Sequence, residues 1–150
     1  MARAIQVAAE NVRGGRGGPF GAVLVENGKI VAEGANSVTA TNDPTAHAEI
    51  TAIRAACAAL RRFDLRGCEL YASCEPCPMC LGAIYWARLD RVYFAAVAAD
   101  ASQAGFADSF ICAELARLPS SRAIPMLQLA HPNALEPFRL WQQQPNKIPY

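Results

Sequence analysis

Apolar and polar residues follow one another along the chain in blocks that predict helices and strands in turn. Residues 2–13 carry apolar side chains at helical spacing, so this segment is expected to be a helix. Residues 20–25 and 29–35 predict two strands, and Asn27-Gly28 between them is typical of a type I′ hairpin turn. The glycine-rich stretch 14–18 lacks both nucleotide-binding fingerprints and is expected to be a turn.

The middle of the chain continues with a helix, a strand, a helix and a strand. The first helix is expected to begin at Asp43-Pro44, because Asp is a favoured N-cap and Pro a favoured first helical residue. Residues 70–73 predict a short strand, 79–87 a helix that is apolar nearly all round, and 92–97 a strand with an unbroken apolar run. Such runs predict that this second helix and the last strand are buried on all sides.

The last third of the chain predicts shorter elements. Its expected parts are a loop, a helix, a fifth strand and a last helix, over residues 100–108, 109–117, 124–129 and 132–144. The alternation of strands and helices predicts an α/β fold, with helices on both faces of the sheet. Ligands in such folds bind beyond the carboxyl ends of strands, which is where Cys77 falls.

Composition predicts one domain over residues 1–150, with a substantial core, since 53% of the residues are hydrophobic. A net charge of +1 gives no electrostatic footprint for nucleic acid, and no apolar stretch reaches the roughly 18 residues of a membrane span. The first residues, which include Glu10, are expected to be a helix rather than a signal peptide. Six cysteines without an export signal predict a reducing compartment, so the protein is expected to be cytoplasmic.

Three residues, His47, Cys77 and Cys80, have the type and spacing of metal ligands. The two cysteines stand three apart at the start of a predicted helix, so their sulfurs share one side, and the helix dipole there favours thiolates. With Glu49 they complete the pattern His-x-Glu … Pro-Cys-x-x-Cys, which is the signature of zinc deaminases. We expect one zinc per chain, a fourth coordination position left for water, and Glu49 as the proton shuttle.

Other interpretations of the cysteines stay open at this point. Cys74 could close a structural zinc site as a fourth ligand, although this leaves Glu49 without a role. The spacing Cys-x-x-Cys-x-x-Cys also begins a ferredoxin-type cluster motif, but Ile84 and Tyr85 stand where that motif continues with Cys and Pro. His47 could instead be an ordinary core histidine.

The stretches Thr41–Ile50 and Ser73–Arg88 closely resemble bacterial guanine deaminases of the cytidine deaminase-like zinc deaminase superfamily. The resemblance covers nearly the whole chain. It includes Ala104–Phe110, which is more specific to guanine deaminases than the zinc motifs, since cytidine, tRNA adenosine and riboflavin-pathway deaminases share those. It implies a three-layer α/β/α sandwich with a mixed five-stranded sheet, a homodimer, and hydrolysis of guanine to xanthine and ammonia.

The resemblance also implies roles for single residues beyond the zinc ligands and Glu49. Asp108 matches a second catalytic carboxylate, and Asn42 a side chain that binds the base, because an amide can donate and accept at once. Phe20 and Trp86 are expected to wall the base by stacking. The plainer alternatives are a turn residue for Asn42, a surface acid for Asp108 and a core residue for Trp86.

The C-terminal segment 132–150 has an unusual number of aromatic residues for a chain end, namely Phe138, Trp141 and Tyr150. The resemblance implies that this segment is exchanged between two subunits and closes the active site, with Tyr150 helping to cover the partner's pocket.

Two other functions remain open from the sequence. A tRNA adenosine deaminase shares the zinc motifs but needs a basic surface for RNA phosphates, and a net charge of +1 does not indicate one. A zinc-stabilised interaction module would have no activity at all. We expect a small-molecule base as the substrate, with nucleosides and triazines as further candidates, and neither nucleic acid nor membrane as a partner.

Overall fold

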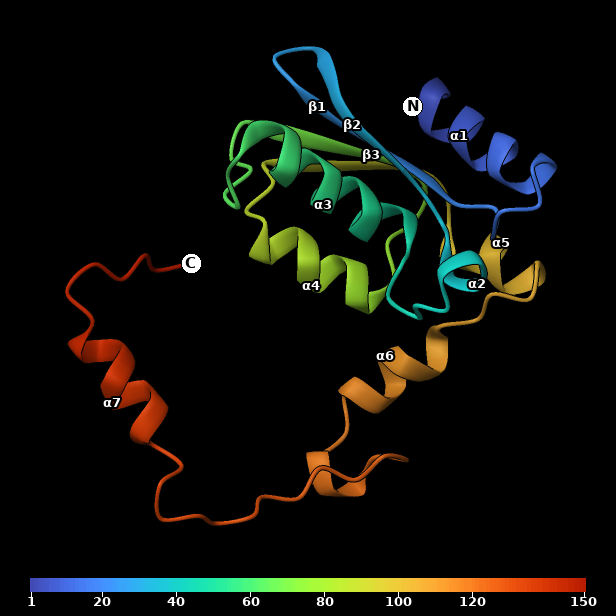
Figure 1. The fold of residues 1–150 in the computed structure, drawn as a ribbon. Coiled ribbons are helices and arrows are strands. Elements are labelled where there is room, and N and C mark those ends of the chain that lie inside the picture. The colour runs from blue at the N-terminus through green and yellow to red at the C-terminus, as the bar shows by residue number, and fades with distance from the viewer. The chain divides into compact units, whose positions relative to one another are not determined.

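The computed structural model describes all 150 residues, which form two compact units, Met1–Ser109 and Phe110–Tyr150. Figure 1 labels most of their helices and strands. None of the helices has the length and apolar character that crossing a membrane requires. In chain order the elements are α1 (Ala2–Arg13), β1 (Gly21–Glu26), β2 (Lys29–Ala35), α2 (Val38–Thr41), α3 (Ala48–Leu60), β3 (Cys68–Cys74), α4 (Pro78–Trp86), β4 (Arg91–Ala96), α5 (Ala98–Gln103), α6 (Ser109–Leu115), η1 (Pro119–Ser121) and α7 (Glu136–Gln143).

A mixed four-stranded sheet of order β2-β1-β3-β4 organises the first unit (Figure 1). β1 runs antiparallel to both β2 and β3, whereas β3 and β4 are parallel. The predicted α1 helix and the predicted hairpin of β1 and β2 are both confirmed. Asn27 and Gly28 have φ angles of 51° and 75°, the positive values that a type I′ turn requires at both central positions.

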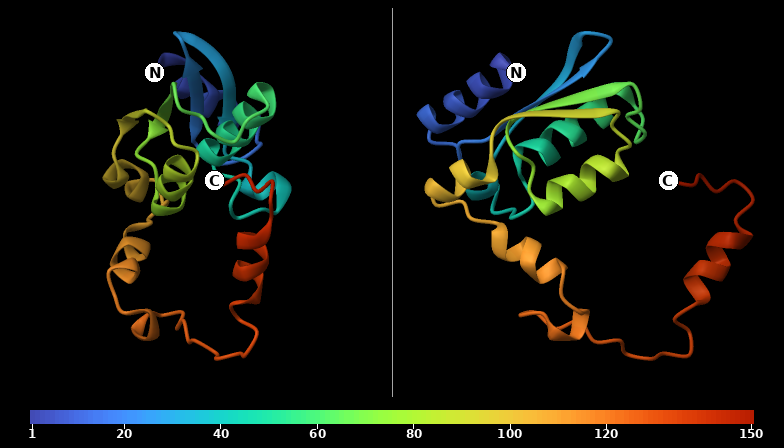
Figure 2. Two further views of the ribbon diagram at one scale, coloured as in Figure 1. Left: turned by 90° about the vertical axis from the view of Figure 1, so that its left-hand side faces the viewer. Right: turned by 180° about the vertical axis from the view of Figure 1, so that it is seen from behind.

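Helices cover both faces of this sheet. Gly34 pairs with Ala22, the neighbour of Gly21, so the two glycines point to opposite faces. A side chain at Gly21 would collide with the backbone of α1, and one at Gly34 with the backbone of α3. The absence of a side chain therefore lets one helix approach each face closely, and α4 lies in the same layer as α3 (Figure 2).

The core of the first unit lies between the sheet and the layer of α3 and α4. Its centre is formed by three leucines that are all 0% exposed. They are Leu24 of β1, Leu70 of β3 and Leu65 of the loop before β3. The residues of α3 in this cluster are mostly alanines, which let the helix lie close to the strands. This close packing fixes the start of α3 relative to the carboxyl end of β3.

The glycine-rich stretch 14–18 is a turn, as predicted, and one buried side chain holds it in place. Asn11 is 1% exposed and donates through Nδ2 to the carbonyl oxygens of Asn36 at 2.7 Å and Gly18 at 3.0 Å. Because buried amides are stable only when hydrogen-bonded, these contacts fix the loop that leads into Phe20 and β1.

The prediction that a helix begins at Asp43-Pro44 is wrong, because α3 begins at Ala48. Asp43 does not cap a helix. Its carboxylate accepts hydrogen bonds from the backbone N–H of Thr45 at 2.8 Å and from the Thr45 hydroxyl at 2.7 Å. This local turn competes with helix capping, and it moves the N-cap to His47.

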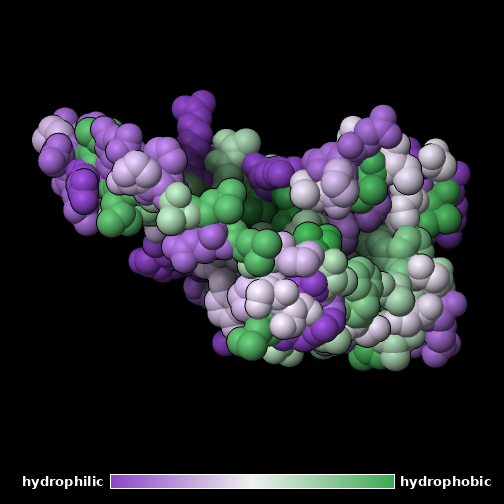
Figure 3. All heavy atoms as spheres, turned by 90° about the horizontal axis from the view of Figure 1, so that it is seen from below, coloured by the Kyte–Doolittle hydropathy of each residue, from purple (hydrophilic) through white to green (hydrophobic).

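The prediction that the helix over 79–87 is buried nearly all round is wrong. Only Cys80 and Ile84 of α4 are buried, whereas Tyr85 and Trp86 are 76% and 69% exposed. α4 packs against its layer on one side only, and an apolar sequence does not reveal whether a neighbour exists on the other. Figure 3 shows hydrophobic residues in green that remain open at the surface.

The predicted five-stranded sheet and the fully covered strand over 92–97 are not confirmed either. Residues 124–129 form no strand, and Ile124 and Leu129 are 82% and 89% exposed. β4 is consequently an edge strand, and its Phe94 is 45% exposed. The apolar run over 124–129 forms no strand because no other strand lies beside it. An isolated strand leaves its backbone N–H and C=O groups without hydrogen-bond partners.

Candidate metal centre and active site

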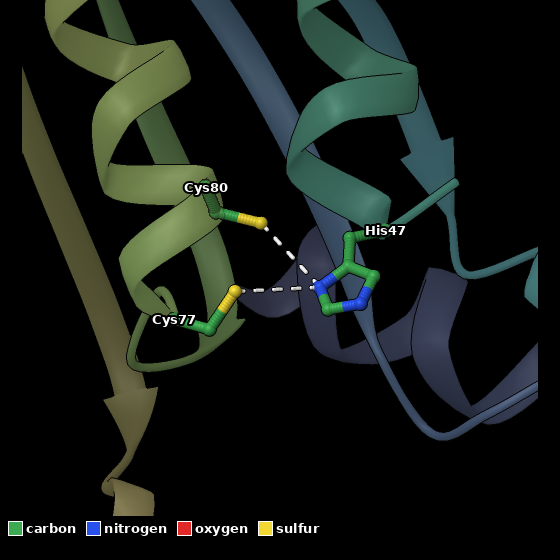
Figure 4. Close-up of side chains that lie close together, drawn as sticks. All are labelled: His47, Cys77 and Cys80. Carbon is green, nitrogen blue, oxygen red and sulfur yellow. Dashed lines mark hydrogen bonds between the residues drawn. The ribbon is translucent and has the colours of Figure 1, made fainter. Parts of the chain in front are cut away.

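Two helix starts bring the predicted metal ligands together. His47 is the N-cap of α3, Cys77 is the N-cap of α4, and Cys80 lies in the first turn of α4 (Figure 4). Pro78 follows Cys77 at the first helical position, where its fixed φ angle suits a helix start. The positive ends of two helix dipoles therefore meet here, an environment that favours thiolates.

The three donor atoms converge on one point. Nδ1 of His47 lies 3.5 Å from Sγ of Cys77 and 3.5 Å from Sγ of Cys80, and all three atoms lie within 4.8 Å of one another. A tetrahedral zinc ion with Zn–N bonds of about 2.0–2.1 Å and Zn–S bonds of about 2.3 Å holds such atoms about 3.5 Å apart. The residues present therefore fit zinc in type, number and spacing.

Cys74 does not join this group, which speaks against a closed structural site and against an iron–sulfur cluster. Its thiol is buried and lies 3.7 Å from the carbonyl oxygen of Val97, to which it donates. The metal-ligand group contains His47, Cys77 and Cys80 only. Three protein ligands with one position left over is the arrangement typical of a catalytic zinc.

The two cysteines differ in pKa because the Cys80 thiol donates a hydrogen bond to the sulfur of Cys77. That bond from the Cys80 thiol, together with His47, lowers the pKa of Cys77 to about 4. The same bond and burial raise the pKa of Cys80. The hydrogen bond to Cys77 in turn raises the pKa of His47, although burial opposes it. A thiolate already present beside a second thiol is suited to receive a cation in exchange for a proton.

Glu49 lies in the first turn of α3, two residues after His47, and is 7% exposed. Burial raises the pKa of this carboxyl, while hydrogen bonds from its own backbone N–H and from Cys80 oppose the shift. A buried carboxylate with a raised pKa beside a metal-ligand group is typical of a general base.

Asp108 lies near the metal-ligand group, and Phe20 contacts the segment that leads to Asp108. The carboxylate of Asp108 raises the pKa of His47 as well, although less than the hydrogen bond to Cys77 and the charges of Cys77 and Glu49. The ring of Phe20 meets that of Phe106 edge to face, with centroids 5.0 Å apart. Phe106 had no role assigned from the sequence, although it lies in the Ala104–Phe110 stretch that carried the resemblance.

The other predicted site residues have more exposed positions. Asn42 is the C-cap of α2 with a φ angle of 52°, a left-handed conformation that Asn tolerates well. Trp86 is the last residue of α4 and is 69% exposed. Tyr150 ends the second unit and is 73% exposed.

Comparisons with known proteins agree with this geometry. Residues 1–96 match the cytidine and deoxycytidylate deaminase zinc-binding region. The chain is 54% identical to guanine deaminase from Bacillus subtilis over 150 residues, which is 100% of this chain and 96% of that protein. The solved structure of the Bacillus subtilis protein superposes with a TM-score of 0.97 over 99% of this chain and 95% of that one.

Two further relatives match less of the chain. A tRNA-specific adenosine deaminase from Aquifex aeolicus is 47% identical over 79 residues, which is 53% of this chain and 52% of that protein. A protein solved in complex with 8-azaguanine is 34% identical, with a TM-score of 0.68 over 71% of this chain and 62% of that one.

Proposed function

The chain belongs to the cytidine and deoxycytidylate deaminase zinc-binding family, and on that basis we propose that it hydrolyses guanine to xanthine and ammonia. One observation carries the choice of guanine: the similarity to guanine deaminase extends over the whole chain, at 54% identity. The similarity to the Aquifex aeolicus tRNA deaminase covers 53% of the chain. The complex of a relative with 8-azaguanine, a close analogue of guanine, supports a free base as the substrate.

His47, Cys77 and Cys80 would hold the zinc. An ion with three protein ligands supplies Lewis-acid chemistry, because it lowers the pKa of a water molecule toward neutrality. Glu49 takes a proton from the attacking water and delivers it to the ring nitrogen beside C2 of guanine. It then passes the second proton to the 2-amino group, because this group leaves readily only as ammonia.

The base is held by three further residues. Asn42 donates to and accepts from the lactam edge of guanine, which presents one donor and one acceptor. Asp108 accepts from the exocyclic amino group and shares the proton traffic, and Phe20 stacks on the ring. The charge of Asp108, which contributes to the raised pKa of His47, supports a place near the metal-ligand group.

Asp108→Asn is expected to lower kcat/KM for guanine about 100-fold, because an amide does not carry protons. Zinc content should stay at one per chain, since Asp108 is not a ligand. Steady-state kinetics and metal analysis of the purified variant measure both. Asp90→Asn, at an exposed position, serves as the control. If the Asp108→Asn variant had the same kinetics as wild type, Asp108 would be a surface residue without a role in the reaction.

We further propose that the protein is a homodimer in which the second unit packs on a second copy. No side chain of this unit, Phe110–Tyr150, is buried, and Leu118, Ile124, Leu127 and Leu129 are 73–89% exposed. A segment of about 40 residues cannot supply a stable core by itself. The exposed apolar side chains of this unit are therefore expected to pack against an apolar surface outside the unit.

The first unit offers such a surface. Ile5 and Val12 of α1 are 47% and 50% exposed, and a largely apolar cavity of about 380 Å³ lies between α1 and the end of β4. The outer edge of β4 is free for a fifth strand, a role suited to residues 124–129 of the second copy. Exchange of an identical segment is an economical route to a two-fold dimer, and it would place Tyr150 over the partner's pocket.

Deleting residues 146–150 is expected to lower guanine turnover at least 10-fold with zinc content unchanged, because an open site admits bulk water to the reacting base. Kinetics and metal analysis of the truncated chain test this. Turnover equal to that of the full chain would remove Tyr150 from the active site.

Mixing the truncated chain with Glu49→Gln chains distinguishes two arrangements. In one, the C-terminal segment closes the active site of the partner subunit, and in the other it closes the site of its own subunit. In an exchanged heterodimer the intact tail of the Glu49→Gln chain closes the site of the truncated chain, so activity returns. Mixing the truncated chain with a Glu49→Gln chain that is also truncated is the matched control. A mixture no more active than its separate components would contradict the exchange.

We also propose that residues 1–150 act as one functional domain in the cytoplasm. None of the six cysteines forms a disulfide, which supports a reducing compartment.

A substrate panel tests the proposed function. The zinc-loaded protein should release ammonia from guanine, and no ammonia from adenosine in a tRNA anticodon stem-loop. Release from the stem-loop alone would assign the chain to the tRNA deaminases. No release from any base, nucleoside or triazine in the panel would indicate a zinc-stabilised interaction module.

A further inference from the structure

Glu75 lies inside the metal-ligand motif, between Cys74 and Cys77, and it holds the junction between β4 and α5 with two hydrogen bonds. Its backbone N–H donates to the carbonyl oxygen of Ala96 at 2.9 Å. Its carboxylate oxygen Oε2 accepts from the backbone N–H of Ala98 at 3.0 Å. The two bonds lie on either side of Val97, so Glu75 fixes the direction in which the chain leaves the sheet.

A second carboxylate completes this junction. Asp100 accepts at Oδ2 from the backbone N–H of Val97 at 2.9 Å. The first N–H groups of a helix have no partner within the helix, and carboxylates that accept from them stabilise the helix start. Glu75 supplies the acceptor that comes from outside α5, and it thereby ties α5 to the loop that carries the zinc ligands.

α5 leads directly to Asp108. After α5 the chain turns at Gly105, whose φ angle is 90°, and the backbone N–H of Phe106 donates to the carbonyl oxygen of Ala101 at 2.9 Å. The Phe106 ring then packs edge to face on Phe20, with centroids 5.0 Å apart. Residues 98–108 are therefore anchored at one end by Glu75 and at the other by Phe20.

We propose that Glu75 is a positioning residue for Asp108, an inference that rests on the proposed function of the site. Glu75 is itself exposed, so the core does not depend on its side chain. Its carboxylate acts by setting the start of α5, and the following segment, held at Phe106 by its ring contact with Phe20, carries this setting to Asp108. Displacements of about 1 Å at a reacting group can cost up to 10²-fold in rate. A loss of about 10-fold is therefore expected when the acceptor is removed.

Two variants separate this role from general stability. Glu75→Ala removes the acceptor, and we expect kcat/KM for guanine to fall about 10-fold with one zinc retained per chain. Glu75→Gln keeps a carbonyl oxygen that can accept from Ala98, so its loss should stay below about 3-fold. Glu69→Ala, at the other end of β3, is the matched control and should behave as wild type. A Glu75→Gln variant as slow as Glu75→Ala would overturn the proposal.

The coupling to Asp108 is measured in a double-mutant cycle. If Glu75 acts through Asp108, adding Glu75→Ala to Asp108→Asn should lower kcat/KM by less than about 2-fold further. Effects that multiply would mean that Glu75 acts independently of Asp108, and they would overturn the proposal.

Amide hydrogen exchange supplies a readout that does not depend on activity. Exchange over residues 98–108 should be faster in Glu75→Ala than in wild type and unchanged in α1, and equal exchange over 98–108 would overturn the proposal. If the wild-type protein failed to deaminate guanine, the proposed function would fall, while the exchange measurement would still decide whether Glu75 positions this segment.

Discussion

Glu49→Gln is expected to lower kcat for guanine about 10³-fold while zinc content and thermal stability remain close to wild type. Glu49 is 7% exposed, and a hydrogen bond between its carboxylate and Cys80 places it at the metal centre, although it is not one of the three ligands. Gln has nearly the same shape and keeps a hydrogen-bonding group in the buried position. It does not accept and return a proton, and both proton transfers of the reaction are lost with it.

Single-turnover kinetics, metal analysis and thermal unfolding of the purified Glu49→Gln variant measure these three quantities together. Glu69→Gln makes the same chemical change on β3, outside the group of metal ligands, and should leave all three unchanged. A Glu49→Gln variant that kept more than a few per cent of the wild-type rate would assign the proton transfers to another residue, with Asp108 the next to examine.

Cys77→Ser is expected to lose zinc and, with it, stability and all turnover. Cys77 supplies the thiolate of lowest pKa, about 4, and a serine hydroxyl stays protonated and binds zinc poorly. In small zinc peptides metal binding is worth about 10–16 kcal/mol. Because this chain has its own core, the expected loss in the free energy of unfolding is the part that zinc binding to the folded state contributes. That part is about 4 kcal/mol when free zinc is 1,000 times the dissociation constant.

Metal analysis and chemical denaturation with and without added zinc test this expectation. Cys112→Ser is the matched control, because Cys112 is exposed and lies in α6, away from the ligand group. Undiminished zinc in Cys77→Ser would contradict the assignment of Cys77 as a zinc ligand. Iron with labile sulfide in the wild-type protein would show that the site holds an iron–sulfur cluster instead of zinc.

The parts of the fold that the sequence predicted correctly are those set by local interactions. The α1 helix and the hairpin depend on apolar periodicity and on Asn27-Gly28, whose left-handed turn is available to few other pairs. The metal ligands were equally accessible, because Cys77 and Cys80 lie on one turn of helix and His47 has a recognisable neighbour in Glu49. Short-range spacing was sufficient to group the three candidate metal ligands, whereas the role of Glu49 stays a prediction.

The errors arose where a distant contact or a missing neighbour decides the structure. α5 lies in a segment predicted as a loop, because the acceptor for Ala98 is Glu75, which is far away in the sequence. The apolar surface of α4 and of β4 predicted burial that the first unit by itself does not provide, as Tyr85 and Phe94 show. Apolar patterning indicates that a surface is buried in the functional protein. It does not indicate which part of which chain buries that surface, and we propose that a second copy does.

Deamination of guanine in ¹⁸O-labelled water tests the central claim most directly, because it follows the bond that forms and the bond that breaks. The zinc-loaded protein should convert guanine to xanthine that carries one labelled oxygen at C2, with one ammonia released per xanthine and a rate proportional to bound zinc. A fully zinc-loaded protein that released neither xanthine nor ammonia from guanine would contradict the account.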